Sequence, residues 1–231
     1  MMKRILVGFL ALTAIMTVIA VLSLGRDVPG MTALAPLAAE AQETGAQETG
    51  AADPAAAAVK DFAIGAEDAP IKFVEYASFT CPHCANFHAE VFGKLKAEYI
   101  DTGKVRFEYR EVYFDRYGLW AAMMARCGGE MRYFGISDIL FSTQKDWAAS
   151  DDAAVVVENL KKIGRTAGME DAALDVCMKD TAEAETLVAH FEAGMKADEI
   201  QGTPTLIING VKHGNMSYED LKLILDAELA K

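Results

Sequence analysis

Two cysteines separated by two residues are the first feature of this 231-residue sequence that could do chemistry. Cys81-Pro82-His83-Cys84 follows a strand-like segment directly and begins a helix-like one. A disulfide across two intervening residues is feasible at a helix N-terminus, where unpaired N–H groups and the helix dipole favour a thiolate. This environment lowers the pKa of Cys81, and a thiolate of low pKa is both a nucleophile and a good leaving group. The motif predicts a redox-active cysteine pair.

The two cysteines are expected to differ in exposure. Cys84 lies one helical turn beyond Cys81, so we expect it to be buried and to act as the resolving thiol, while His83 can add a donor or a positive charge. Two other interpretations remain open. Cys81, Cys84 and His88 have the spacing of zinc ligands, but no second cluster completes a metal site. A purely structural disulfide across so short a loop would stabilise little. We therefore expect no metal.

Local patterns predict the elements that must position the motif. Residues 71–78 alternate between apolar and polar side chains, which is typical of a strand, with Glu75 on the face of Ile71 and Phe73. Apolar residues then recur at a spacing of four up to about residue 100, which predicts a helix, and Pro82 suits its first turn. Residues 105–113 alternate again, and a second strand parallel to the first would complete a β-α-β unit.

The rest of the folded part divides into a helical block and a short return to the sheet. Residues 115–199 have helical periodicity throughout. Strands are then expected at 205–208 and 211–213, joined by the turn dipeptide Asn209-Gly210, and Ser217 caps a last helix. Two sheet-forming pieces separated by helices indicate an α/β domain with an all-helical insertion at about 115–199.

The first sixty residues do not belong to this domain. Lys3 and Arg4 precede an uncharged run at 5–24, so residues 1–25 are expected to be a cleaved signal peptide or an uncleaved signal anchor. Residues 26–60 are rich in Ala, Gly, Glu and Gln and predict a flexible tether. Either N-terminal alternative places the folded part, 61–231, outside the cytoplasm. The net charge of −12 argues against binding to nucleic acid.

Two stretches resemble a known family. Residues 73–84, which end in Cys81-Pro82-His83-Cys84, resemble the active-site stretch of DsbA-like thiol:disulfide oxidoreductases, and Gly202-Thr203-Pro204-Thr205 resembles the cis-proline loop of the thioredoxin superfamily. The helical insertion is also similar. The resemblance covers about 61–231 and implies a thioredoxin-like fold.

The resemblance also implies roles for single residues. Cys81 would be the attacking cysteine, Cys84 the resolving one, and His83 the histidine that stabilises the reduced thiolate. Thr203-Pro204 would have a cis bond that presents the Thr203 backbone to an extended substrate peptide. Glu75 would be the buried acid beneath the site, able to accept the proton of Cys84. A strand-edge glutamate and an ordinary trans proline are the alternatives.

Cys127 and Cys177 form a second pair, fifty residues apart in the helical block. In an oxidising compartment an even leftover pair favours a structural disulfide. Some alpha-proteobacterial DsbA-like proteins carry an extra pair of this kind, by resemblance. Two separate buried thiols are the alternative.

These observations lead to an expected function. We expect a monomeric, periplasmic oxidoreductase that donates the Cys81–Cys84 disulfide to folding secreted proteins and needs no other cofactor. The resemblance implies reoxidation by a DsbB-like membrane quinone reductase. Two alternatives stay open: an isomerase or reductase of the same superfamily, favoured by Thr203 before the proline, and a non-catalytic, chaperone-like binding module.

Overall fold

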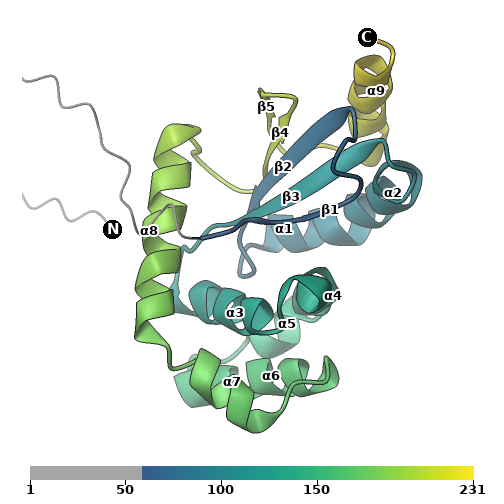
Figure 1. Cartoon of the computed structure of the whole chain (residues 1–231). Helices are drawn as coiled ribbons and strands as arrows, with labels where there is room; N and C mark the ends of the chain where they lie inside the picture. Colours follow the sequence, from purple (N-terminus) through teal and green to yellow (C-terminus); the bar gives the residue numbers. More distant parts are fainter. Residues whose placement is uncertain (1–58) are drawn as a thin grey trace, which may run out of the picture. The chain divides into compact units, whose positions relative to one another are not determined.

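The computed structural model describes residues 59–231 (Figure 1). The expected signal segment, 1–25, lies outside the described residues, and so does all of the expected tether except Val59 and Lys60. Within 59–231, no helix has the length and apolar character needed to cross a membrane.

A five-stranded mixed sheet forms the centre of the described domain. Its strands are β1 (Phe62–Ile64), β2 (Ile71–Ala77), β3 (Val105–Glu111), β4 (Thr205–Ile208) and β5 (Val211–His213). They are arranged in the order β1-β3-β2-β4-β5, with β2 and β3 parallel and the other pairs antiparallel. Because β2 is the middle strand, both of its edges are paired. This confirms the predicted strands before and after the motif and their parallel pairing.

A single helical run follows the cysteine motif. It comprises α1 (Pro82–Phe87), the π-helical η2 (His88–Phe92), α2 (Gly93–Leu95) and the π-helical η3 (Lys96–Ile100). Apolar side chains at a spacing of four, Phe87, Val91, Leu95 and Tyr99, are all buried, which is why the run packs on the sheet. The C-terminal helix α9 (Tyr218–Leu229) packs beside it, where the Tyr99 hydroxyl donates to Asp226 over 2.6 Å.

Six helices form the insertion between β3 and β4. They are α3 (Arg116–Cys127), α4 (Glu130–Ser142), α5 (Gln144–Trp147), α6 (Ala153–Thr166), α7 (Asp171–Cys177) and α8 (Thr181–Ala197). In Figure 1, α3 to α7 lie together beyond α1, while α8 runs along the side of the domain. Phe191 and Met195 of α8 pack on Tyr76, whose side chain lies on the face of β2 opposite Phe73.

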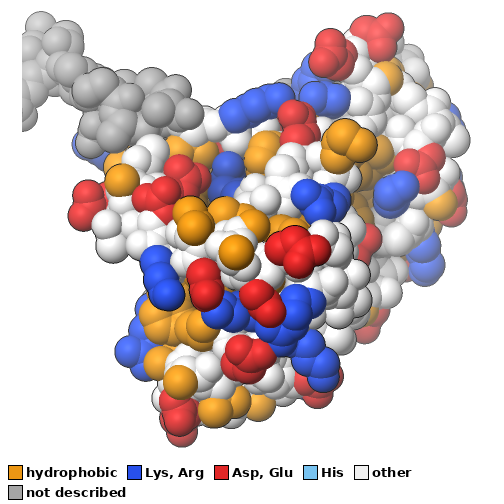
Figure 2. Space-filling view, turned by 60° about the horizontal axis from the view of Figure 1, so that its bottom comes forward, with side chains coloured by type: hydrophobic (Ala, Val, Ile, Leu, Met, Phe, Trp, Pro, Cys, Tyr) orange, Lys and Arg blue, Asp and Glu red, His pale blue; other side chains and the backbone are white. Residues whose placement is uncertain are grey.

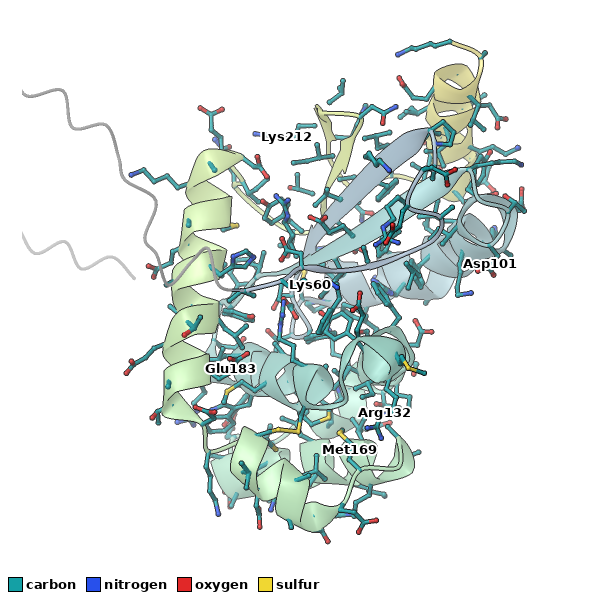
Figure 3. The ribbon with its side chains drawn as sticks, in the orientation of Figure 1. Lys60, Asp101, Arg132, Met169, Glu183 and Lys212 are labelled. Carbon is teal, nitrogen blue, oxygen red and sulfur yellow. A yellow bond between two sulfur atoms is a disulfide. The ribbon has the colours of Figure 1, made fainter. Side chains whose placement is uncertain are left out.

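A buried ion pair joins the sheet to the insertion. Glu111, at the end of β3, accepts two hydrogen bonds from Arg126 of α3, at 2.8 and 2.5 Å, and one from the Tyr133 hydroxyl of α4 at 2.6 Å. The Arg126 and Glu111 side chains are 8% and 2% exposed. Lys60 (Figure 3) adds two contacts to this connection between sheet and insertion. Its carbonyl accepts a hydrogen bond from Arg126 over 3.0 Å, and its ammonium group pairs with Glu130. The start of the domain is thereby tied to the insertion.

The predicted α/β class, with a thioredoxin-like sheet and a helical insertion, is confirmed. Two short elements were missed. The three residues of β1 are too few to show an alternation, and β1 forms only because β3 offers a free edge. The four residues of α5 are too few to show a helical period.

The outer face of the insertion carries charges of both signs. Figure 2 shows basic and acidic side chains interspersed on this face, with hydrophobic side chains between them. Arg165 of α6 pairs with Glu158 at 2.5 Å and with Asp171 at 2.8 Å, and Lys161 pairs with Asp175.

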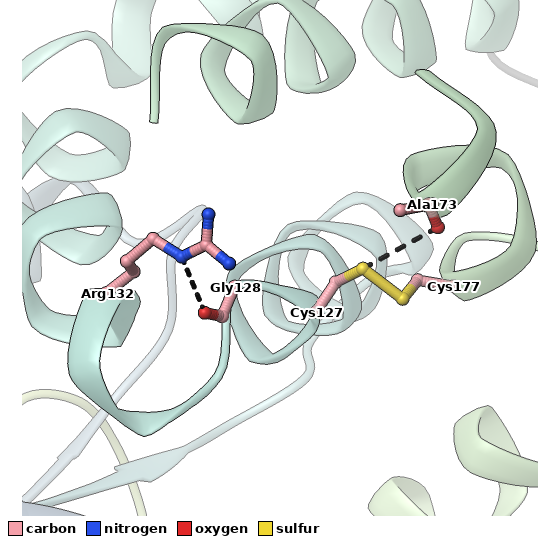
Figure 4. Close-up of a disulfide and its surroundings, with 5 residues drawn as sticks. All are labelled: Cys127, Gly128, Arg132, Ala173 and Cys177. Carbon is pink, nitrogen blue, oxygen red and sulfur yellow. Dashed lines mark hydrogen bonds between the residues drawn. A yellow bond between two sulfur atoms is a disulfide. The ribbon is translucent and has the colours of Figure 1, made fainter. Parts of the chain in front are cut away.

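A disulfide joins Cys127, the last residue of α3, to Cys177, the last residue of α7 (Figure 4). The two Cα atoms are 5.9 Å apart, and the Cys127 sulfur lies 3.7 Å from the carbonyl oxygen of Ala173. Beside it, Arg132 Nε donates to the Gly128 carbonyl over 2.9 Å, at the turn between α3 and α4. The bond closes a loop that contains α4, α5, α6 and α7.

Loss of this disulfide should destabilise the domain. We expect the double variant Cys127→Ala/Cys177→Ala to unfold with a free energy about 2–4 kcal/mol lower than the parent, because the unfolded chain regains the entropy of an open loop. Denaturant unfolding measures the difference. In a Cys81→Ser/Cys84→Ser background, the unfolded and unreduced protein should have no titratable thiol. Two titratable thiols would contradict the assignment.

Candidate active site

The motif cysteines lie where β2 passes into α1. Cys81 is the N-cap residue of α1, and its carbonyl oxygen accepts from the N–H groups of Cys84 and Ala85, both over 3.1 Å. Pro82 occupies the first turn, where its missing N–H leaves no backbone acceptor unpaired. Both cysteines are free thiols in this structure, Cys81 partly exposed and Cys84 fully buried. The sequence therefore places one sulfur toward solvent and the other in the core.

The environment of Cys81 stabilises its thiolate. A hydrogen bond from the Cys84 thiol, together with the backbone N–H groups of Cys84 and His83, lowers the pKa of Cys81 to about 5, although burial opposes the change. The contribution of His83 seen here comes from its backbone, and its side chain is exposed. A helix N-terminus thus acts on the exposed sulfur as the motif predicted.

The pKa of Cys84 changes in the opposite direction. Its hydrogen bond to Cys81 raises its pKa, and burial and the negative charge of Glu75 raise it further. At neutral pH the pair therefore consists of a Cys81 thiolate and a neutral Cys84 thiol that donates to it. This unequal pair is what nucleophilic attack through Cys81 and resolution through Cys84 require.

A loop from the C-terminal part of the chain meets Cys81. The Thr203–Pro204 peptide bond is cis, and the Cys81 sulfur lies 3.6 Å from the Thr203 carbonyl oxygen, to which it donates when protonated. The pairing of β4 with β2 carries the loop there, because Thr205 lies opposite Tyr76 in the register. Residues 122 apart in the sequence thereby come into contact at the reactive sulfur.

Glu75 lies beneath the cysteines on β2 and is fully buried. Its Oε2 atom is 3.1 Å from Nε2 of His88, and within residues 59–231 its Oε1 atom has no hydrogen-bond partner. The alternative interpretation of Glu75 as a strand-edge glutamate is wrong, because β2 is the central strand of the sheet. The charge of Glu75 acts on the pKa of Cys84, so the two groups belong to one site.

Gln144 is a site residue that sequence reasoning missed. Its buried side-chain amide donates to the carbonyls of Phe79 and Cys81, over 2.8 and 3.0 Å. Gln144 begins α5, so the insertion holds the backbone of the cysteine motif directly. A second contact joins the same parts, where the Thr80 hydroxyl donates to Asp115, the N-cap residue of α3, over 2.7 Å. No local pattern distinguishes Gln144 from an ordinary helical glutamine.

The zinc interpretation finds no support in the geometry. Across the described domain, no three His, Cys, Asp or Glu side chains are grouped as they would be to hold a metal ion. His88, the third member of the suspected ligand run, pairs with Glu75 instead.

Comparisons with known proteins agree with the site. The family model described as thioredoxin matches residues 57–227. A putative protein-disulfide oxidoreductase of Rickettsia bellii is 35% identical over 167 residues, which cover 72% of this chain and 63% of that protein. The chain thus spans less than two thirds of the length of this relative.

Solved structures are similar over the same region. The crystal structure of alpha-DsbA1 of Wolbachia pipientis superposes with a TM-score of 0.69 at 29% identity, covering 74% of this chain and 92% of that one. Oxidised BdbD of Bacillus subtilis has a TM-score of 0.66 at 22% identity and covers 74% and 94% of the two chains. The second likeness supports the fold alone.

The unequal cysteine pair can be tested by titration. The ultraviolet absorbance of the thiolate in the reduced protein should give a midpoint near the pKa of about 5 for Cys81. In a Cys84→Ala variant the midpoint should rise, because the largest cause of the low value is lost. Cys84→Ser keeps a donor at this position and should shift the midpoint less. An equal shift in both variants would contradict the hydrogen bond as the leading cause.

The role of Gln144 can be tested by stability. Gln144→Leu leaves the Phe79 carbonyl without its donor, whereas the Cys81 carbonyl keeps two helical N–H partners. We expect the free energy of unfolding to fall by about 1–3 kcal/mol, the cost of one unsatisfied buried group. Denaturant unfolding measures it, with the exposed Lys145→Leu as control. Equal stability of Gln144→Leu and the parent would contradict this role.

Proposed function

Because this chain belongs to the thioredoxin family, among its DsbA-like members, we propose that it is a protein-disulfide oxidoreductase that donates its Cys81–Cys84 disulfide to folding proteins. The observation that carries the proposal is the opposite direction of the two thiol pKa values, lowered for Cys81 and raised for Cys84. A stable Cys81 thiolate favours the reduced enzyme, so the oxidised enzyme gives up its disulfide readily.

The pH dependence of this preference follows from linkage. The folded protein lowers the pKa of Cys81 from 9.0 to about 5, so between these values the folded reduced state binds fewer protons than the unfolded one. The resulting stabilisation is complete above pH 9 and is lost as the pH falls through about 5. The reduced enzyme is therefore favoured at the neutral pH of an extracytoplasmic compartment.

The exchange proceeds in two substitutions at sulfur. A substrate thiolate attacks Sγ of oxidised Cys81, a mixed disulfide forms, and the bond to Cys84 breaks with its electron pair on Cys84, which then takes a proton. A second substrate thiolate attacks the substrate sulfur of the mixed disulfide, and Cys81 leaves as a thiolate. The substrate has lost two electrons and gained a disulfide, and the enzyme carries the two electrons as a reduced pair.

The surroundings of Cys81 are suited to an extended peptide. The Thr203 backbone, whose carbonyl already lies 3.6 Å from the Cys81 sulfur, offers main-chain hydrogen bonds to a substrate strand. A surface cavity of about 600 Å³ adjoins this loop and β5, and it is lined by Gln201, Gly202 and Lys212 among others. These features favour unfolded polypeptides as substrates.

The cellular setting is part of the proposal. The Cys127–Cys177 disulfide is typical of an oxidising compartment, which supports a site of action outside the cytoplasm. A catalytic cycle that donates disulfides needs an electron acceptor, and we propose a DsbB-like membrane quinone reductase for this step. An isomerase remains the second candidate, because threonine precedes the cis-proline.

The reduction potential of the pair decides between these functions. Equilibration with glutathione should give a potential more oxidising than about −180 mV, the value of an isomerase, whereas a value near −270 mV would indicate a reductase. Oxidised protein should restore activity to a reduced, unfolded disulfide-containing enzyme. The Cys81→Ala variant should not, and equal activity of this variant and the parent would refute a catalytic role.

A further inference from the structure

The exchange reaction leaves one buried pair unexplained. Glu75 and His88 are 3.1 Å apart between Oε2 and Nε2, with side chains only 0% and 6% exposed. Within residues 59–231, neither side chain is hydrogen-bonded to Cys81 or to the cis-proline loop. A buried titratable pair is costly to form, and such pairs cluster at functional sites. Its position beside a reactive thiol therefore suggests a function.

The helix places His88 in line with the buried thiol. His88 follows Cys84 by four residues, so the two side chains lie on the same helix face one turn apart. Glu75 of β2 meets the His88 ring over 3.1 Å, and its negative charge raises the pKa of Cys84. Sulfur, carboxylate and imidazole thus form a row beneath the site, in which the carboxylate and the imidazole are hydrogen-bonded and the sulfur is affected by the carboxylate charge.

Aromatic rings from α4, η2 and β3 hold the imidazole in place. The His88 ring stacks on Phe141 of α4, with centroids 3.9 Å apart and planes inclined by 21°. Phe92 lies on it at 4.6 Å, and the Tyr109 ring meets it edge-on at 6.3 Å. The ring is therefore held in one orientation, with Nε2 toward Glu75. Phe141 of the insertion covers one face of the ring.

The other side of His88 borders a cavity. A cavity of about 350 Å³ between α1–η3 and α4 is lined by His88, Phe92, Lys96, Asp138 and Phe141 among others. Asp138 lines the same cavity as His88, and burial raises the pKa of Asp138. Nδ1 of His88 has no hydrogen-bond partner in the part of the chain that the structure describes. His88 thus stands between a fully buried carboxylate and a cavity at the domain surface.

We propose that His88 relays the proton between Glu75 and this cavity whenever the Cys81–Cys84 bond opens or closes. The inference rests on the proposed function, because it concerns the proton that the exchange reaction moves. His88 acts through Glu75, so it is a positioning and relay residue and does not touch the substrate.

The proton balance of the step is simple. When the disulfide opens, Cys84 leaves with the electron pair of the broken bond, and a proton passes to it from Nε2 of His88 through the Glu75 carboxylate. His88 then takes up one proton from the cavity, so that Glu75 is a carboxylate before and after the step. When the disulfide closes, the same transfers run in reverse and one proton leaves through the cavity.

The groups that face the relay set its pH dependence. They are Glu75 on β2, Cys84 on α1, Tyr109 on β3, Asp138 on α4 and Lys96 on η3. Burial raises the pKa of Tyr109, so this phenol stays neutral and does not compete for the proton. Imidazole is the side chain that exchanges protons between about pH 5 and 8.

The test compares two substitutions of different shape. His88→Phe keeps the stacked ring and removes the proton carrier, whereas His88→Gln keeps a donor for Glu75 and removes the ring. Stopped-flow reduction of each oxidised protein by dithiothreitol should be slower than for the parent by roughly 10- to 100-fold, at or below the lower end of what a positioned proton donor contributes. The ratio of parent to variant rate should also change between about pH 5 and 8.

Chemical rescue and controls complete the experiment. The His88→Ala variant opens the ring site to the cavity, and added imidazole should recover part of its rate. His190→Gln removes a histidine of α8 that pairs with Asp61, outside the row, and should react like the parent. A His88→Phe variant as fast as the parent at every pH, or a His88→Ala variant that imidazole does not accelerate, would overturn the relay.

The proposed function and the relay can fail separately. If the parent and Cys81→Ala are equally unable to oxidise a dithiol peptide, the proposed function is wrong. If the parent oxidises this peptide through Cys81 while the His88 variants match it, only the relay is wrong.

Discussion

The structure depends on keeping two sulfur atoms, three residues apart, in unequal surroundings. Cys81 sits at the solvent end of α1 among N–H groups, and Cys84 sits one turn lower in the core. A single helix turn could not create this difference alone, because either sulfur would face water on an isolated helix. The packing of α1 on β2 excludes water from Cys84, and the charge of Glu75 beneath it makes a second thiolate unfavourable. The direction in which the pair exchanges electrons follows from that asymmetry.

The helical insertion takes part in maintaining this asymmetry. The Gln144 amide donates to the carbonyls of Phe79 and Cys81, and Phe141 stacks on the His88 ring. Both contacts require the insertion to keep its position against the sheet, and the buried pair of Glu111 and Arg126 provides that attachment. Separating the insertion from the sheet would break this ion pair and leave an uncompensated buried charge, which is strongly unfavourable. The insertion is therefore part of the active-site wall as well as a cover for the domain.

The sequence could predict the strands, helices and turns whose patterns lie within a few neighbouring residues. The alternation of β2, the spacing of apolar residues after Cys84 and the turn at Asn209 each appear within a few residues, and the structure confirms the elements that they predict. The contacts of His88 and Gln144 could not be predicted in this way. His88 has a spacing that also suits a zinc ligand, and only the fold shows that Glu75 faces it. Gln144 reaches carbonyls 63 and 65 residues away, and no pattern in its own helix records that contact.

Burial of Cys84 links the equilibrium of the reaction to its kinetics. The same exclusion of water that keeps this thiol neutral also removes the solvent that would protonate it when the disulfide opens. The proton must then come through protein groups, and the carboxylate of Glu75 is the charged group whose effect on Cys84 is evident. A carboxylate with 0% exposure cannot exchange protons with solvent directly. A third group that reaches both Glu75 and a cavity meets this need, and His88 has that position in the fold.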